Sequence, residues 1–129
     1  MNIEEQIKYW VDSSEHDLPV AESLFQSGHY SWCLYIAHLI LEKMLKAIYV
    51  MDNKKTAPKT HDLLLIAKST NLILNKEQEE FLSRVTDFNI EARYPDSKLK
   101  FYKLATKEFA IENFTKIKEF DKWLKSQMK

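Results

Sequence analysis

The sequence predicts an all-helical fold, an antiparallel up-down bundle of four long helices plus one short helix. The chain of 129 residues contains one glycine and three prolines. This scarcity argues against a sheet-rich fold, which needs many tight turns. Apolar residues also recur at helical spacing in four long segments. With 45% hydrophobic residues the chain can bury one core, so we expect a single domain over residues 1–129.

The first two helices are expected over residues 3–26 and 29–51. Pro19 lies inside the first segment and should kink the helix or restart it after Leu18, with Ser13 or Ser14 as a cap. The second segment is apolar on nearly every face. Such a helix is typical of a central position, buried on several sides or shared with a partner.

Three further helices are expected after a polar loop over residues 52–60. A short helix should cover residues 61–69, and a long one should run from about residue 77 to residue 93. Pro95 disfavours helical geometry at the residue before it, which ends that long helix. The last helix is expected as one unbroken element over residues 99–127, because its apolar stripe keeps helical spacing throughout.

Charge and hydropathy exclude several classes of protein. Lys plus Arg and Asp plus Glu both number 19, so the bulk charge does not indicate a nucleic-acid binder. Lysines do gather at positions 98, 100, 103 and 107, and again at 116, 118, 122 and 125. They form either a solvated helix face or a weak phosphate-contact surface.

Residues 1–8 lack the apolar run of a secretory signal, and no segment is long and apolar enough to span a bilayer. We expect a cytoplasmic protein without membrane contact.

Few residues form a recognisable catalytic or metal-binding pattern. His38 and Glu42 are four residues apart and could face one metal, but no third or fourth ligand follows at a suitable spacing. We therefore expect His38 to be hydrogen-bonded to a neighbour, and we predict neither a metal nor another cofactor. Cys33 lies among apolar residues and should behave as a small hydrophobe. A single glycine excludes Walker and Rossmann phosphate loops.

The most distinctive stretch is Ala92–Asp96, at the expected end of a helix. Arg93 is one of only two arginines, and its fork of donors suits a phosphate or a carboxylate. Tyr94 supplies a stacking face, and Asp96 could cap the last helix. In the alternative account, Arg93 forms a structural ion pair with Asp17 and Tyr94 packs.

The first two helices should contribute companions to this corner, because they are antiparallel neighbours. We predict a nucleotide-binding or partner-binding surface and assign no catalytic residue. Its members are Arg93, Tyr94, Asp96, Asp17, His38, Lys43 and Lys46.

Four stretches, in order and at matching spacing, resemble the signatures of HEPN domains. They are Ser14–Leu18 with Gly28–Tyr30, Ala37–His38 with Glu42–Ala47, Thr60–Leu63, and Ala92–Asp96. The resemblance implies a helical bundle that commonly forms homodimers and is linked to nucleotides or RNA. It also implies a minimal nucleotidyltransferase as partner, often in a toxin–antitoxin pair.

The chain departs from active HEPN ribonucleases at their Arg-x4–6-His motif. Such an arginine and histidine would bind the phosphodiester and move its protons. In this chain, no histidine stands five to seven residues after either arginine. Those positions are Asn89, Ile90 and Glu91 after Arg84, and Lys98, Leu99 and Lys100 after Arg93. The resemblance therefore favours a non-catalytic HEPN module that partners a nucleotidyltransferase and helps to hold nucleotide or RNA.

Two alternatives remain open. One is a ribonuclease with an unusual set of residues, such as Arg93, Asp96 and His38. The other is a structural or interaction bundle that binds no ligand, because the chain has no fixed phosphate loop.

Overall fold

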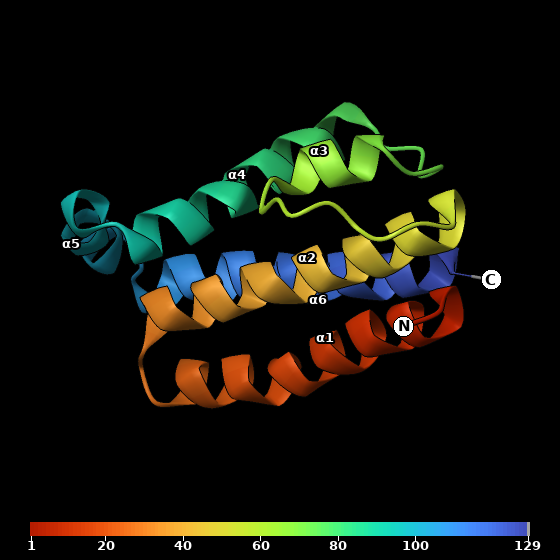
Figure 1. The fold of residues 1–129 in the computed structure, drawn as a ribbon. Coiled ribbons are helices and arrows are strands. Elements are labelled where there is room, and N and C mark those ends of the chain that lie inside the picture. The colour runs from red at the N-terminus through yellow and green to blue at the C-terminus, as the bar shows by residue number, and fades with distance from the viewer. Residues whose placement is uncertain (129) are drawn as a thin grey trace.

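The all-helical prediction is confirmed by the structure, a computed structural model that describes residues 1–128 apart from the side chains of residues 95 and 96. The helices of this part are α1 (Ile3–Gln26), α2 (Tyr30–Asn53), α3 (Leu63–Lys68), α4 (Lys76–Arg93), α5 (Pro95–Leu104) and α6 (Lys107–Gln127). Four are long, and α3 and α5 are short (Figure 1). The predicted bundle has one short helix, whereas the described residues form two.

Helix α2 is the centre of the fold. It packs against each of the other five helices of the described chain, and it lies between α1 and the layer formed by α3 and α4 (Figure 1). Leu34, Leu41 and Leu45 on this helix are completely buried. The apolar residues around all sides of α2 therefore have a partner helix on most faces, as a central helix requires.

Helix α1 continues through Pro19 without the expected restart. The carbonyl of Glu15 loses its helical partner because proline has no N–H. Pro19 and Glu15 are both exposed, so this carbonyl can bind water instead. Ser14 is not a cap, since its buried hydroxyl donates a hydrogen bond to the carbonyl of Ile40 on α2 at 3.0 Å.

The segment after α4 differs from the prediction. Helix α4 ends at Arg93 as expected, but α5 begins at Pro95, and the predicted unbroken last helix is wrong. Proline suits the first helical position because it needs no N–H partner there. Helix α6 starts anew because the hydroxyl of Thr106 accepts a hydrogen bond from the backbone N–H of Phe109 at 3.2 Å.

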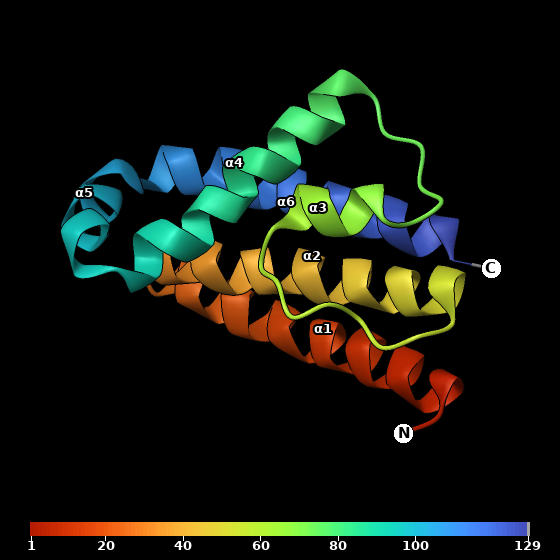
Figure 2. The ribbon, with the colours of Figure 1, turned by 45° about the horizontal axis from the view of Figure 1, so that its top comes forward.

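The arrangement of helices brings distant segments together. Helices α1 and α4 run toward the end of the molecule where α5 lies, and α2 and α6 run away from it (Figure 1). The loop between α2 and α3 returns along α2 before α3 begins, as both ribbon views show (Figure 2). Within residues 1–128, no helix combines the length and the apolarity needed to cross a membrane.

Candidate functional site

One face of α2 carries three buried polar side chains. His38, Glu42 and Lys46 are spaced four residues apart, so they lie one above another on the same side of the helix. Their exposed fractions are 0%, 4% and 6%. Burial of such groups is costly unless each finds a partner, so the surrounding elements must supply one for each.

The Glu42 carboxylate has partners on both oxygens. Its Oε2 accepts a hydrogen bond from Lys46 Nζ at 3.1 Å, and its Oε1 accepts one from His61 Nδ1 at 2.8 Å. His61 belongs to the loop before α3. The ammonium of Lys46 also lies over the ring of Trp10 on α1, 5.2 Å from the centroid. The buried carboxylate is thus compensated by groups from α2 and from the loop before α3, and α1 contacts the ammonium that pairs with it.

His38 is held as a neutral ring with a defined tautomer. Burial lowers its pKa, and the nearby Glu42 carboxylate only partly opposes this effect. His38 Nε2 lies 3.1 Å from the carbonyl oxygen of His61. A carbonyl can only accept, so Nε2 carries the proton and Nδ1 accepts. Asn89 Nδ2 lies 3.5 Å from Nδ1 and is the matching donor.

The hydrogen bonds continue from the interior to the surface along α4. Asn89 is 2% exposed, and its Oδ1 accepts a hydrogen bond from Nη1 of the exposed Arg93 at 3.2 Å. We call the connected set the polar network. Its members are Arg93, Asn89, His38, His61, Glu42 and Lys46. The surface guanidinium is thus fixed by the buried Asn89, which in turn contacts the buried His38.

The other predicted site residues lie outside the polar network. Asp17 on α1 pairs with Lys43 on α2 at 2.6 Å, so the alternative of an Arg93–Asp17 pair is wrong. Among the described side chains, no ion pair includes Arg93. Tyr94 is 55% exposed beside it. The side chain of Asp96 lies outside the described residues.

The comparisons with known proteins agree with this fold. The family model for the HEPN domain matches residues 7–127. The chain belongs to the HEPN-domain family. It is also similar to the crystal structure of TT1696 from Thermus thermophilus, with a TM-score of 0.83 and 18% sequence identity. That match covers 99% of this chain and 100% of the other, and at such low identity it shows the fold alone. A comparison with curated proteins finds no match.

Sequence reasoning missed several members of the polar network in this HEPN domain. Glu42 stands out in the sequence only for its spacing, and Asn89 only as a departure from the Arg-x4–6-His motif. The spacing of Asn89 and Arg93, four residues apart on α4, was an available signal. No local pattern indicated that the loop would place His61 against Glu42.

Two further groups do not extend the site. Cys33 is completely buried, and burial raises the pKa of its thiol to about 12, so it behaves as the expected small hydrophobe. Within the described chain, no group of three or more His, Cys, Asp or Glu side chains could hold a metal ion.

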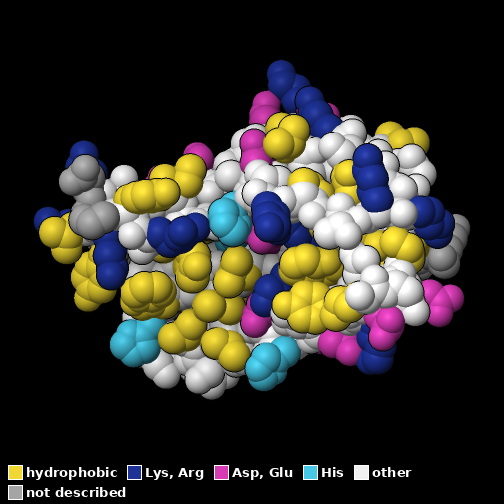
Figure 3. Space-filling view, viewed as in Figure 1, with side chains coloured by type: hydrophobic (Ala, Val, Ile, Leu, Met, Phe, Trp, Pro, Cys, Tyr) yellow, Lys and Arg dark blue, Asp and Glu magenta, His cyan; other side chains and the backbone are white. Residues whose placement is uncertain are grey.

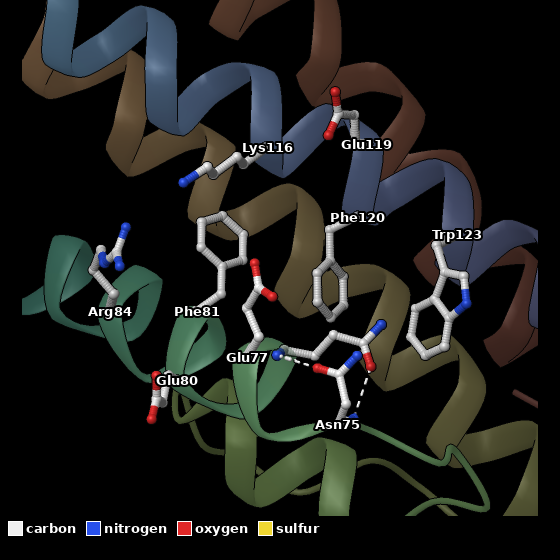
Figure 4. A pocket seen from close by; sticks show the side chains of 10 residues that line it. Asn75, Glu77, Glu80, Phe81, Arg84, Lys116, Glu119, Phe120 and Trp123 are labelled. Carbon is white, nitrogen blue, oxygen red and sulfur yellow. Dashed lines mark hydrogen bonds between the residues drawn. The ribbon is translucent and has the colours of Figure 1, made fainter.

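A separate groove of about 470 Å³ lies between α4 and α6 (Figure 4). Phe81, Phe120 and Trp123 supply its aromatic surface. Both of its cations and the amides at its end already have partners, whereas among the described side chains no ion pair includes its glutamates, Glu77, Glu80 and Glu119. The Arg84 guanidinium lies 5.9 Å from the centroid of the Phe81 ring, and Lys116 pairs with a neighbouring glutamate on α6 at 3.3 Å. The amides at its end form the capping box of α4. Arg93, whose guanidinium is held by Asn89, lies outside this groove.

Proposed function

We propose that this HEPN domain is a non-catalytic module that binds a nucleotide or an RNA phosphate at Arg93 and Tyr94. The hydrogen bond from Arg93 to the buried Asn89 carries the proposal. It uses one nitrogen of the guanidinium and leaves the rest of the fork for a ligand. A pre-positioned fork suits phosphate oxygens, and the exposed Tyr94 offers a stacking face.

The buried members of the polar network position this arginine and do not touch the ligand themselves. His38 is completely buried, so it acts through Asn89, whose amide it orients. Lys46 neutralises Glu42 inside the fold. Lys43 and Asp17 form a half-buried pair between α1 and α2, and this pair stabilises the helix that carries the network.

Calorimetric titration with ATP, AMP and a short RNA tests the proposal. Arg93→Lys keeps the charge but loses the fork, so binding should weaken by about tenfold or more while the melting temperature stays nearly unchanged. Arg84→Lys is the matched control and should bind as the wild type does. Equal binding by wild type and Arg93→Lys, or no binding by either, would show that this corner is structural.

A minimal nucleotidyltransferase is the proposed protein partner, as in toxin–antitoxin pairs. Family membership and the exposed Arg93 corner, which could receive an acidic loop, support this partner. The test is co-purification with a nucleotidyltransferase encoded beside this chain. The wild type should retain it and Arg93→Lys should retain less. Failure of the wild type to retain such a protein would remove this part of the proposal.

We also propose a homodimer that forms through α2. Hydrophobic side chains gather over α1 and α2 on the face shown in Figure 3. On α2, Trp32 is 42% exposed, and Tyr35 and Ile36 are only partly buried. Light scattering should give about twice the chain mass, and Ile36→Arg should reduce it to one chain. Ile111→Arg on α6, at a residue that is 45% exposed, is the control and should stay dimeric.

A second candidate function is cleavage of RNA with His61 as the group that moves protons. The hydrogen bond from His61 Nδ1 to Glu42 favours it, because that bond leaves Nε2 of a half-exposed ring with a free lone pair. The non-catalytic proposal expects no cleavage of mixed RNA above a buffer control. If RNA is cleaved, and both His61→Ala and Arg93→Ala abolish the cleavage, the ribonuclease function would replace the non-catalytic one.

A further inference from the structure

The charges of this chain are unevenly distributed, and α5 is the basic part. Residues 95–107, which span α5 and the first residue of α6, contain four lysines and one acidic residue, Asp96, while the whole chain has a net charge of zero. This segment therefore carries a net charge of +3 and the rest of the chain −3. Helix α5 lies at one end of the molecule, beyond the ends of the long helices (Figures 1 and 2). The positive charge is thus concentrated on an outlying element.

Among the described side chains of α5, Phe101 is buried and most others are exposed. Phe101 is 1% exposed and stacks on Phe88 of α4, with 5.4 Å between the ring centroids. By contrast, Leu99, Tyr102 and Leu104 are 71%, 70% and 53% exposed. Three large side chains exposed on one short helix beside lysines fit a contact surface.

The lysines and aromatic rings of this end are interleaved. The ammonium of Lys98 lies over the ring of Trp32, 4.9 Å from its centroid, and Tyr102 follows one helical turn later on the same side of α5. Tyr102 and Lys103 line a hollow of about 340 Å³ that Tyr30 also lines. Among the described side chains, no carboxylate forms an ion pair with any of the four lysines.

We propose that the α5 surface, defined as Lys98, Lys100, Tyr102 and Lys103 of α5 together with Lys107 at the start of α6, binds single-stranded nucleic acid. Proteins that bind single strands combine cations that follow the backbone with aromatic rings on which bases stack. Here the lysines contact phosphates, and Tyr102 stacks on one base at the edge of the hollow. A duplex offers phosphates but keeps its bases paired, and an acidic peptide has no base to stack. The inference goes beyond the function proposed above, because it rests on different side chains from the Arg93 corner.

The experiment measures the fluorescence anisotropy of labelled 12-nucleotide strands of uridine and of deoxythymidine, with a mixed-sequence duplex and polyglutamate as competitors. Both strands should bind more tightly than the duplex, and polyglutamate should compete poorly. Tyr102→Ala should weaken binding by about tenfold or more without changing its salt dependence. Tyr102→Phe should bind as the wild type does, because it keeps the ring.

The lysines have a separate signature in the salt dependence of binding. Lys100→Gln should reduce the slope of log affinity against log salt concentration by about 0.7, the contribution of one phosphate contact on a single strand. Lys122→Gln on α6 and Tyr9→Ala on α1 are the matched controls and should change neither affinity nor slope. All of these side chains are exposed, so unchanged melting temperatures should accompany every variant.

Three outcomes overturn the inference. The first is absence of binding, and the second is equal binding of the strand, the duplex and polyglutamate, which would leave only general attraction of polyanions. The third is strand binding that survives in Tyr102→Ala and is lost in Arg93→Lys, which would assign the strand to the proposed phosphate site. If strand binding is lost only in the α5 variants, the inference is supported, whether or not ATP binds at Arg93.

Discussion

The buried polar residues of α2 and those of α6 are satisfied in different ways. On α2, the side chains of His38, Glu42 and Lys46 all have partners. On α6, Asn113 and Asp121 are 1% and 5% exposed, and each keeps one buried side-chain oxygen without a hydrogen-bond partner in the described chain. The two helices bury similar groups in the same core, so the difference lies in what surrounds them.

The buried polar residues of α2 and those of α6 differ in how far away along the sequence their partners lie. Asn113 donates to the carbonyl of Phe109, one turn earlier on α6, and Asp121 pairs with Lys125, one turn later. Helix α2 also has one pair within the helix, Glu42 with Lys46, but it receives further partners from α4 and from the loop before α3. Contacts that join separate elements depend on the whole fold, whereas contacts within one helix need only that helix. The comparison indicates that the polar network holds elements together, while the buried groups of α6 cost free energy.

The largest expected effect comes from removing the centre of the polar network. Glu42→Ala would leave Lys46, whose side chain is 8% exposed, as a buried charge without a counter-ion. We expect the free energy of unfolding to fall by about 3–5 kcal/mol, the usual cost of removing one partner of a buried pair. Unfolding by urea, followed by circular dichroism, measures the change.

The control for this prediction is an ion pair of the same spacing on the surface. Glu112 and Lys116 on α6 lie 3.3 Å apart, and their side chains are 59% and 47% exposed. Glu112→Ala should change the free energy of unfolding by less than about 1 kcal/mol, because exposed pairs contribute little. A loss of similar size in both variants would mean that the polar network does not stabilise the fold in the way described.

Much of the fold could be predicted from apolar spacing and from proline. The all-round apolar character of α2 predicted its central place, and Pro95 predicted the end of α4 at Arg93. The break between α5 and α6 could not be predicted in this way, because the apolar stripe continues across it with helical spacing. Only the side-chain cap at Thr106 marks the new start, and many threonines in helices are not caps.

The candidate site was less predictable than the fold. His38, Lys46 and Arg93 were predicted together, and the structure joins them through Glu42, His61 and Asn89. Spacing within a helix shows which residues share a face, but it does not show which loop or helix comes to lie opposite. That information depends on tertiary packing, which a single sequence does not contain.

The second prediction concerns pH and tests the neutral state of His38. Its folded pKa lies below the ordinary value of 6.5 because of burial, so the unfolded chain binds the proton more readily than the folded one. Stability should therefore fall as pH decreases below about 6.5, with a slope of up to about 1.4 kcal/mol per pH unit for one proton. Urea unfolding at several pH values between 7 and 5 measures the slope.

His38→Gln provides the control for that slope. Glutamine can donate to the carbonyl of His61 and accept from Asn89, but it does not titrate in this range. The variant should be less stable at pH 7, and its stability should decrease less steeply toward pH 5. An unchanged slope would show that His38 is not the source of the pH dependence.

The smallest effect is expected for Asp121→Asn on α6, which should stabilise the protein. Burial raises the pKa of Asp121, and the Lys125 ammonium opposes this only in part. The folded state therefore binds the proton more readily than the unfolded chain, and stability decreases as pH rises from about 3.8 through the raised folded value. Asp121→Asn removes this titration and leaves only Lys125, 38% exposed, without its partner.

At pH 7 we expect Asp121→Asn to raise the free energy of unfolding by about 1 kcal/mol or less. The gain should shrink toward pH 4, because protonation then removes the charge from the wild type as well. Asp12→Asn on α1, at an exposed carboxylate paired with Lys8, is the control and should show no such gain. A loss of stability in Asp121→Asn at pH 7 would mean that this carboxylate stabilises the fold despite its unpartnered oxygen. The buried polar groups of α6 would then resemble those of α2, and the contrast between the two helices would not hold.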